Sequence, residues 1–321
     1  MRFSQPFLKD KIVQTVHDPK LNTAGKTWPD RMVSARESVL DWITFTRPSC
    51  VLNPEHQHPS LIQGSNLPAR MREVLDRIKA DAMDAQGVHV NYIAIRDHPA
   101  YFEFRKKLSP SLRGFDPASL ESEAERIAFW INLYHVLVLD AIISFGVKRS
   151  VAEGWLGLLS FFRRAAYIVG GYRLSLNDIE HGILRGNAGH PLTPGPHFAS
   201  PDTRRAWVVH NPDPRIHFAL NCASHSCPPI RIYSAENLDA QLDLATRSFL
   251  DANVKINPTR KILAVSSIFR WYARDFGGRE GVISFLLNHL PSDEHRAWLS
   301  VYRGSVRINY VPYDWSLNVS S

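Results

Sequence analysis

Residues 121–145, ESEAERIAFWINLYHVLVLDAIISF, form the most strongly patterned stretch of the chain. Four charged residues occupy its first six positions and most of the rest is apolar, which predicts a long buried helix. Gly146 follows, at a position where helices commonly end. Asn132, His135 and Asp140 interrupt the apolar run, which indicates the core helix of a globular protein rather than a membrane span.

Shorter helical and strand patterns surround this segment. Apolar residues recur at three- and four-residue steps from Leu67 to Met83, which predicts a helix that Gly87 ends. The pair Gly170-Gly171 between two apolar runs predicts a β-hairpin over 167–176. Further helices are expected at 33–46, 100–108, 177–184, 238–253, 267–276 and 281–290, and strands at 215–221, 261–265 and 306–311. This mixture predicts an α+β fold, with helices packed on a small, mostly antiparallel sheet.

The N-terminal part of the chain is more weakly patterned than the rest. Prolines and glycine recur through 48–68, which predicts a loop or linker. We therefore expect residues 1–66 to be an N-terminal extension and linker, and residues 67–321 to be a single α+β domain. A chain of 321 residues can bury a full core without disulfides or metal.

Composition excludes several classes of protein. With 44% hydrophobic and 21% charged residues, the chain is not a disordered, collagenous or disulfide-scaffold protein. The net charge is +7, but the basic residues are scattered, so a nucleic-acid partner is not expected. Three cysteines and the absence of an apolar run at residues 1–11 predict a cytoplasmic protein. The sequence gives no indication of the oligomeric state.

Two motifs place polar side chains on predicted helices. In FWINLYH, residues 129–135, Asn132 either ties the helix to a neighbouring loop or orients a catalytic group. In SLNDIEHGILR, residues 175–185, Glu180 and His181 lie near a helix N-terminus, which keeps an imidazole neutral. His181 is therefore a candidate general base, and the alternative is a solvated Glu-His pair on a surface helix.

The third motif, DPRIHFALNCASHSCPP at residues 213–229, contains two of the three cysteines. Strand alternation predicts that Cys222 is buried as a small apolar residue. Cys227 lies in a loop before Pro228 and is expected to cap a helix. A thiol at a helix N-terminus with an imidazole nearby has a lowered pKa, which predicts a thiol nucleophile.

Two alternatives remain open for these cysteines. Cys222 and Cys227 could form a redox pair, or they could ligate zinc with His217 or His225. Neither spacing is a standard one for those sites. We predict no metal and no cofactor.

These motifs together resemble the domain-of-unknown-function family numbered 547. The matching stretches are 129–134, 175–185, 217–222 and 226–228, and residues 313–318, YDWSLN, are similar to the usual ending of that family. The resemblance covers about residues 85–321, and His135 stands where a second Asn is expected. The activity of the family is not established. Plant relatives look like fusions with leucine-zipper or glutaredoxin segments, and this chain has neither such heptads nor a Cys-x2-Cys motif.

The leading functional hypothesis is a cysteine-dependent hydrolase or acyl-transferase, loosely similar to the papain and transglutaminase group. Cys227 attacks the carbonyl of an amide or ester in an unidentified small molecule or peptide, and His181, or else His217, takes its proton. Supporting roles in orienting the base or binding substrate are assigned to Glu180, Asn132, Asn221, Cys222 and Arg185. The alternatives are a non-catalytic binding or scaffold module with structural His and Cys, and a thiol redox protein. Whether the protein is an enzyme is therefore left open.

Overall fold

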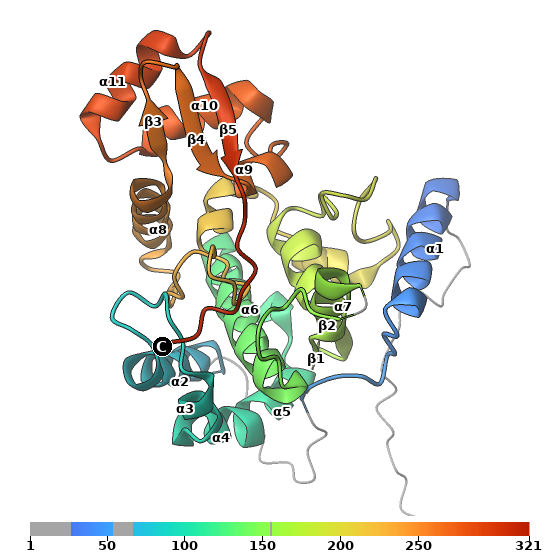
Figure 1. Ribbon diagram of the computed structural model, residues 1–321. Coiled ribbons are helices and arrows are strands. Elements are labelled where there is room, and N and C mark those ends of the chain that lie inside the picture. The colour runs from blue at the N-terminus through green and yellow to red at the C-terminus, as the bar shows by residue number, and fades with distance from the viewer. Residues whose placement is uncertain (1–26, 54–66, 155, 321) are drawn as a thin grey trace, which may run out of the picture.

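The computed structural model describes residues 27–53, 67–154 and 156–320, and its centre is the helix α6 (Glu123–Phe145) (Figure 1). Ser122 caps α6, because its hydroxyl accepts a hydrogen bond from the N–H of Glu125 at 3.1 Å. Gly146 ends the helix in the left-handed conformation, with φ of 64°. The predicted helix is thus confirmed. By length and composition α6 could cross a membrane, but it is mostly enclosed by protein and acts as a core helix.

The remaining elements are short, apart from a few amphipathic helices. The α-helices are α1 (Trp28–Ile43), α2 (Leu67–Ala82), α3 (Tyr92–Arg96), α4 (Pro99–Glu103), α5 (Ser109–Ser111), α7 (Gly157–Arg164), α8 (Leu238–Asn253), α9 (Ile268–Trp271), α10 (Gly278–His289) and α11 (Asp293–Tyr302). The 3-10 and π turns are η2 (Phe104–Leu108), η3 (Leu112–Gly114), η4 (Pro117–Ser119), η5 (Asp178–Leu184), η6 (Thr203–Trp207) and η7 (Pro214–Phe218). The strands are β1 (Ala166–Val169), β2 (Tyr172–Ser175), β3 (Lys255–Asn257), β4 (Ile262–Ser266) and β5 (Arg307–Val311).

The two sheets are small, as the α+β prediction requires. β1 and β2 form the predicted hairpin, in which Tyr167 faces Leu174 and Gly170-Gly171 make the turn with positive φ. β4 pairs antiparallel with β3 and parallel with β5. The α+β class is therefore confirmed, with antiparallel pairing in the majority.

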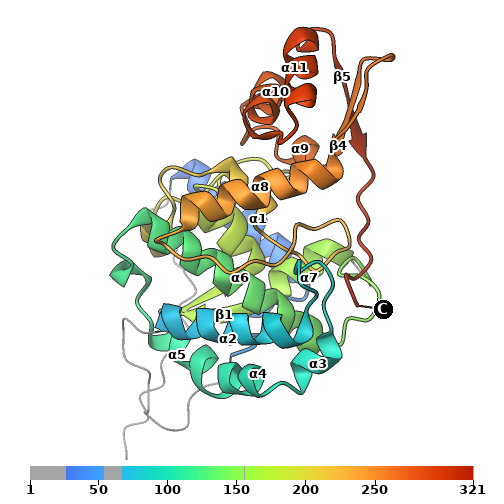
Figure 2. The ribbon, with the colours of Figure 1, turned by 90° about the vertical axis from the view of Figure 1, so that its left-hand side faces the viewer.

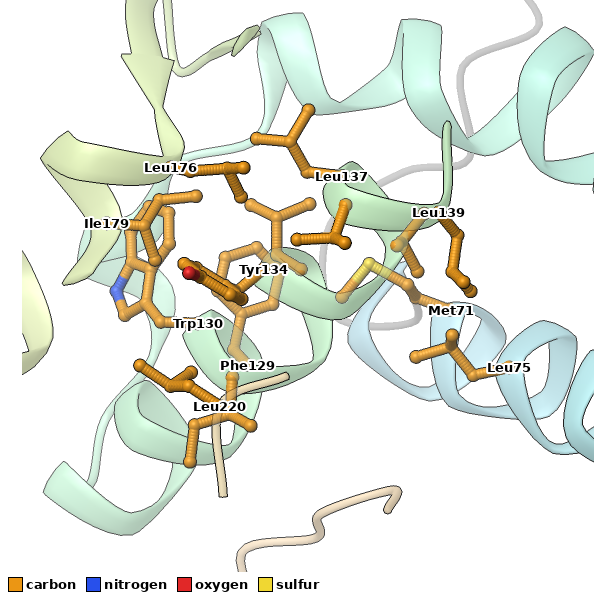
Figure 3. Close-up of a cluster of buried hydrophobic side chains, with 14 of the residues drawn as sticks. Met71, Leu75, Phe129, Trp130, Tyr134, Leu137, Leu139, Leu176, Ile179 and Leu220 are labelled. Atoms are coloured by element: carbon orange, nitrogen blue, oxygen red, sulfur yellow. The ribbon is translucent and has the colours of Figure 1, made fainter. Parts of the chain in front are cut away.

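The larger hydrophobic core surrounds α6. Trp130 and Tyr134 pack toward Ile179 of η5, and further along α6 the side chain of Leu139 lies near Met71 of α2 (Figure 3). α2 and α8 lie on the same side of α6, and the C-terminal sheet with α10 and α11 stands beyond one end of it (Figure 2). That C-terminal region has a second core of aromatic and aliphatic residues, to which Phe218 of η7 belongs.

Asp140 and one ring nitrogen of His135 have hydrogen-bond partners inside this core, whereas the Nδ1 atom of His135 has none among the described residues. Asp140 is fully buried and accepts hydrogen bonds from the hydroxyls of Tyr101 and Tyr167, each at 2.6 Å. The Nε2 atom of His135 lies 3.0 Å from the carbonyl oxygen of Ala219. Burial lowers the pKa of His135 to about 4, so this imidazole is neutral.

Several sequence-based boundaries are wrong. The strand expected at 215–221 is instead the turn η7, because Asp213 accepts a hydrogen bond from the N–H of Arg215 at 2.8 Å and starts a 3-10 turn. Every residue from 216 to 221 is buried, so the apolar run does not alternate as a strand does. No helix begins at Pro228, and Cys227 is therefore not a helix cap.

The other differences are smaller. The helix expected at 267–276 is only α9, and several elements, among them α3, α7, β3 and α11, were not predicted. The N-terminal helix α1 starts five residues earlier than expected, because Thr27 and Asp30 form a capping box. Most of the loop predicted at 48–68, and residues 1–11, lie outside the described residues. The single-domain assignment of 67–321 stays a prediction.

Asn132 joins α6 to a neighbouring segment through its side-chain amide. It is buried, its Nδ2 donates to the carbonyl of Tyr233 at 2.7 Å, and its Oδ1 accepts from the N–H of Tyr233 at 3.0 Å. Tyr233 lies beyond the cysteine loop, so the structure favours the tying role rather than contact with a catalytic group. We expect Asn132→Leu to lower the free energy of unfolding by about 1–3 kcal/mol, because two backbone groups lose their partner. Urea denaturation checks this, and Asn253→Ala, at an exposed position at the end of α8, should cost clearly less.

Candidate functional site

The third sequence motif forms a tight loop at residues 221–227. Asn221 is buried and closes this loop from within. Its Oδ1 accepts from the N–H of Ala223 at 2.7 Å, and its Nδ2 donates to the carbonyl of Pro228 at 2.6 Å. Ala223 adopts a positive φ of 69°, which turns the chain back on itself. The role of Asn221 here is therefore to shape the loop.

The loop brings two thiols into contact. The Sγ atoms of Cys222 and Cys227 lie 2.6 Å apart. Three more groups lie within hydrogen-bonding distance of the Cys227 sulfur: the N–H of Cys222 at 3.0 Å, the hydroxyl of Ser224 at 3.1 Å and the hydroxyl of Tyr313 at 3.2 Å. Each of these groups can donate, and a thiolate only accepts. The arrangement therefore favours the ionised form of Cys227.

The pKa values of the two thiols follow from these contacts. Burial alone would raise the pKa of Cys227, but hydrogen bonds from Cys222, Ser224 and Tyr313 lower it to about 7. The pKa of Cys222 is raised well above its ordinary value, first because its proton is held against the Cys227 sulfur and then because of burial. The pair thus shares one proton, with Cys227 as the thiolate. Cys222 is half-buried rather than fully buried as predicted, because the strand that was to hide it does not form.

The C-terminal segment holds Tyr313 over these thiols. Residues 313–318 run beside the loop, and the N–H of His225 donates to the carbonyl of Ser316 at 2.7 Å. The ring of Tyr313 also packs against Trp271, with 5.0 Å between centroids. The chain thus returns from β5 to complete the cysteine site (Figure 1).

Glu180 lies in a buried cluster next to the thiols. It is on η5, where its carboxylate accepts from the hydroxyl of Tyr134 at 3.0 Å and from that of Tyr272 at 2.6 Å. The alternative of a solvated surface pair is therefore wrong. Burial and the charge of Glu180 raise the pKa of both tyrosines well above its ordinary value, and Cys222 adds to the rise when it is ionised. The two clusters are thus electrostatic neighbours.

His181 and His217 belong to a network centred on an ion pair. Arg185 donates to Asp275 twice, at 2.6 and 2.8 Å, and His217 Nε2 lies 2.8 Å from the same carboxylate. Arg185 also lies 3.1 Å from His181 Nδ1, and because a guanidinium only donates, that nitrogen accepts. Burial lowers the pKa of both histidines, so both are neutral. The ring of His217 stacks on Tyr272 at 3.9 Å.

A pocket of about 420 Å³ opens beside this network. The polar and aromatic groups that line it include Arg185, His190, His217, Trp271, Arg274 and Asp275. Trp271 borders the pocket and packs against Tyr313, so one aromatic ring links the pocket wall to the thiol cluster. The arrangement could admit a small molecule or an extended side chain.

Residues 117–250 match the family described as "Protein of unknown function, DUF547". The chain contains a DUF547 domain. No curated protein and no solved structure matches the chain. The matched part of the DUF547 domain includes α6, η5, η7 and the cysteine loop, and it ends within α8. The resemblance stated from the motifs is therefore confirmed over residues 117–250, and its extension to about 85–321, with the ending YDWSLN, stays a prediction.

The DUF547 domain brings most predicted site residues into two adjoining groups. Asn221, Cys222 and Cys227 form one group, and the other contains Glu180, His181, Arg185 and His217. Asn132 belongs to neither, because it bonds to Tyr233. Within the described residues, no hydrogen bond joins Cys227 to a histidine. The site roles assigned to the histidines stay predictions.

Four side chains of these two groups were missed by sequence reasoning. They are Ser224, Tyr272, Asp275 and Tyr313. A signal existed only for Ser224 and Tyr313, which lie inside stretches already singled out. Across residues 27–53, 67–154 and 156–320, no group of three or more His, Cys, Asp or Glu side chains is placed to hold a metal ion. The Nε2 atom of His217 bonds to Asp275, so only the Nδ1 atom of that ring could serve the zinc alternative.

Proposed function

We propose that the DUF547 domain is a dithiol–disulfide oxidoreductase, in which Cys227 attacks and Cys222 resolves. One observation carries this proposal: two free thiols are in contact, and the hydroxyls of Ser224 and Tyr313 lie closer to the sulfur of Cys227, which also has a backbone N–H donor, than to that of Cys222. A redox pair needs a thiolate to attack and a protonated neighbour within reach. The pKa of Cys227, at about 7, is close to the value at which a thiol attacks fastest at neutral pH.

The reaction would run through a mixed disulfide. The Cys227 thiolate attacks one sulfur of a substrate disulfide, and the other substrate sulfur leaves as a thiolate, which takes the proton of Cys222. Cys222, now a thiolate, attacks the Cys227 sulfur and releases the second substrate sulfur as a thiolate, which takes a proton from solvent. The substrate gains two electrons and the pair becomes a disulfide. An external thiol restores the reduced pair, which fits the cytoplasmic location predicted from the sequence.

Trapping the mixed disulfide tests this proposal. In a Cys50→Ser background, mild oxidation should remove two hydrogen atoms and link Cys222 to Cys227, detected by intact mass and peptide mapping. With a small aromatic disulfide, Cys222→Ser should accumulate a mixed disulfide at Cys227, because nothing resolves it. Cys227→Ser should accumulate none. Failure to form the internal disulfide under any oxidant would contradict the oxidoreductase proposal.

A cysteine-dependent hydrolase or acyl-transferase is the second candidate. The observation that favours it is the pocket beside the Arg185–Asp275 pair, which His217 lines, while the neutral base candidate His181 lies next to Arg185. A neutral imidazole can accept a proton, and the donors around Cys227 could polarise a carbonyl oxygen. Cys222→Ser separates the candidates, since acyl transfer needs no second thiol and would survive this change.

A further inference from the structure

The helix α1 is held on the domain by its charged face. Arg163 of α7 donates to the carboxylates of Glu37 and Asp41 at 2.9 and 2.6 Å, and Asp30 accepts from the N–H of Ser200 at 2.6 Å. Val33 is buried on the same side. All three acidic residues of α1 therefore point toward the domain or pair with it.

The opposite face of α1 is apolar and faces solvent. It is formed by Trp28, Met32, Ala35, Val39 and Trp42, and Phe45 continues it just past the helix end. At about 100° per residue, the five helical positions fall within an arc of about 80°. Trp28 is 73% exposed and Trp42 is 79% exposed. We call these six residues the outer face of α1.

This polarity is the reverse of what an ordinary surface helix shows. Such a helix buries its apolar stripe and exposes its charges, whereas α1 buries its carboxylates and exposes two tryptophans. Contiguous exposed apolar surface of this kind marks a binding face. α1 lies at the edge of the molecule, next to α7, where it is accessible from outside (Figure 1).

Exposed arginines near the outer face of α1 favour a negatively charged partner. Arg31 is exposed at the border of the outer face, Arg47 is exposed beyond its end, and Arg164 is exposed on the neighbouring α7. Within the described residues, these exposed charges at the border of the outer face are basic, while the acids of α1 are paired or buried on its other side. Tryptophan beside arginine is typical of side chains at the headgroup level of a bilayer. A coiled-coil partner is disfavoured, because the stripe spans only about two heptads and stable pairing takes at least three.

We propose that the outer face of α1 docks the protein on an anionic lipid bilayer, with α1 lying in the plane of the headgroups. Trp28 and Trp42 enter the boundary between headgroups and acyl chains, and Arg31 and Arg47 contact lipid phosphates. This surface attachment involves no membrane-spanning segment. It does not depend on the thiol chemistry proposed above, and binding is measured without any activity.

Vesicle sedimentation with the full chain tests the proposal. The protein should bind vesicles of phosphatidylcholine containing about one-third phosphatidylserine, bind pure phosphatidylcholine less, and dissociate in high salt. Trp28→Ser with Trp42→Ser should weaken binding by about tenfold or more, since both side chains lose their apolar contact. Val301→Ser on α11 is the matched control, because Val301 is 74% exposed outside the outer face. This control variant should bind like the wild type.

Other occupants give different results. If the chain fails to bind anionic vesicles and sediments as a dimer that Trp42→Ser dissociates, a second copy covers the outer face and the lipid proposal is overturned. It is also overturned if the double tryptophan variant binds as tightly as the wild type. Unchanged circular dichroism and thermal unfolding confirm that each variant folds, as expected for exposed positions.

Discussion

Replacing Tyr313 with phenylalanine is expected to raise the pKa of the Cys227 thiol by about one to two units. The Tyr313 hydroxyl lies 3.2 Å from the Cys227 sulfur and helps to hold its pKa at about 7. A hydrogen bond to a charged group contributes about 1.5–3 kcal/mol, and one pKa unit corresponds to about 1.4 kcal/mol. At pH 7 the thiolate fraction, and with it the rate of iodoacetamide alkylation at Cys227, should fall about tenfold or more.

The measurement is the pH dependence of alkylation, followed at each cysteine by mass spectrometry. In the wild type the rate at Cys227 should rise with a midpoint near pH 7, while Cys222 should label only at higher pH. Ser224→Ala should shift the Cys227 midpoint in the same direction as Tyr313→Phe. Tyr310→Phe, on β5 and away from the thiols, is the matched control and should leave it unchanged.

A histidine variant decides whether an imidazole or the neighbouring hydrogen-bond donors lower the pKa of the Cys227 thiol. The sequence hypothesis pairs Cys227 with His181, so that His181→Ala would abolish reactivity below pH 8. The groups around the Cys227 sulfur are instead the hydroxyls of Ser224 and Tyr313 and the thiol and backbone N–H of Cys222. His181 bonds to Arg185. We therefore expect His181→Ala to leave the midpoint within about half a unit. A large shift with His181→Ala and none with Tyr313→Phe would restore the Cys-His interpretation.

Local signals explain the parts of the fold that the sequence predicted well. The helix α6 carries its own cap, apolar run and terminal glycine, and the β1–β2 hairpin carries its Gly-Gly turn. These features depend on neighbours within a few residues, so apolar periodicity and turn residues were sufficient to predict both elements. The family assignment likewise rested on contiguous motifs, and the match over 117–250 confirms it.

The site could be predicted only in part, because its contacts join residues that are far apart in the sequence. The run IHFALN is buried on every side, so an alternation rule assigned faces that do not exist. Cys227 and Tyr313 are 86 residues apart, and His217 and Asp275 are 58 apart. No spacing rule connects such pairs. The cysteines and histidines were identified by residue type, whereas their partners had to be found in the structure.

The largest loss of stability is expected from Asp275→Ala. Asp275 is the common acceptor for Arg185 and His217, whose side chains are both almost fully buried. Removing the carboxylate leaves a buried guanidinium without its ionic partner, which costs about 3–5 kcal/mol when such a pair is broken. Urea denaturation at pH 7 measures the change in the free energy of unfolding. Asp243→Ala is the control, because its pair with Arg247 is an exposed i,i+4 pair worth less than about 1 kcal/mol.

The pH dependence of this loss identifies its cause as electrostatic. Arg185 and His217 hold the pKa of the Asp275 carboxyl well below its usual range, although burial acts in the opposite direction. A lowered pKa in the folded state contributes stability that is complete above the unfolded pKa of about 4 and disappears as the pH falls toward the folded value. The difference between wild type and Asp275→Ala should therefore be constant from pH 5 to pH 7 and shrink below about pH 4. If the difference in stability persists unchanged in acid, the loss is due to packing rather than to charge. If the loss at pH 7 is no larger than that of Asp243→Ala, Asp275 does not hold His217 in position.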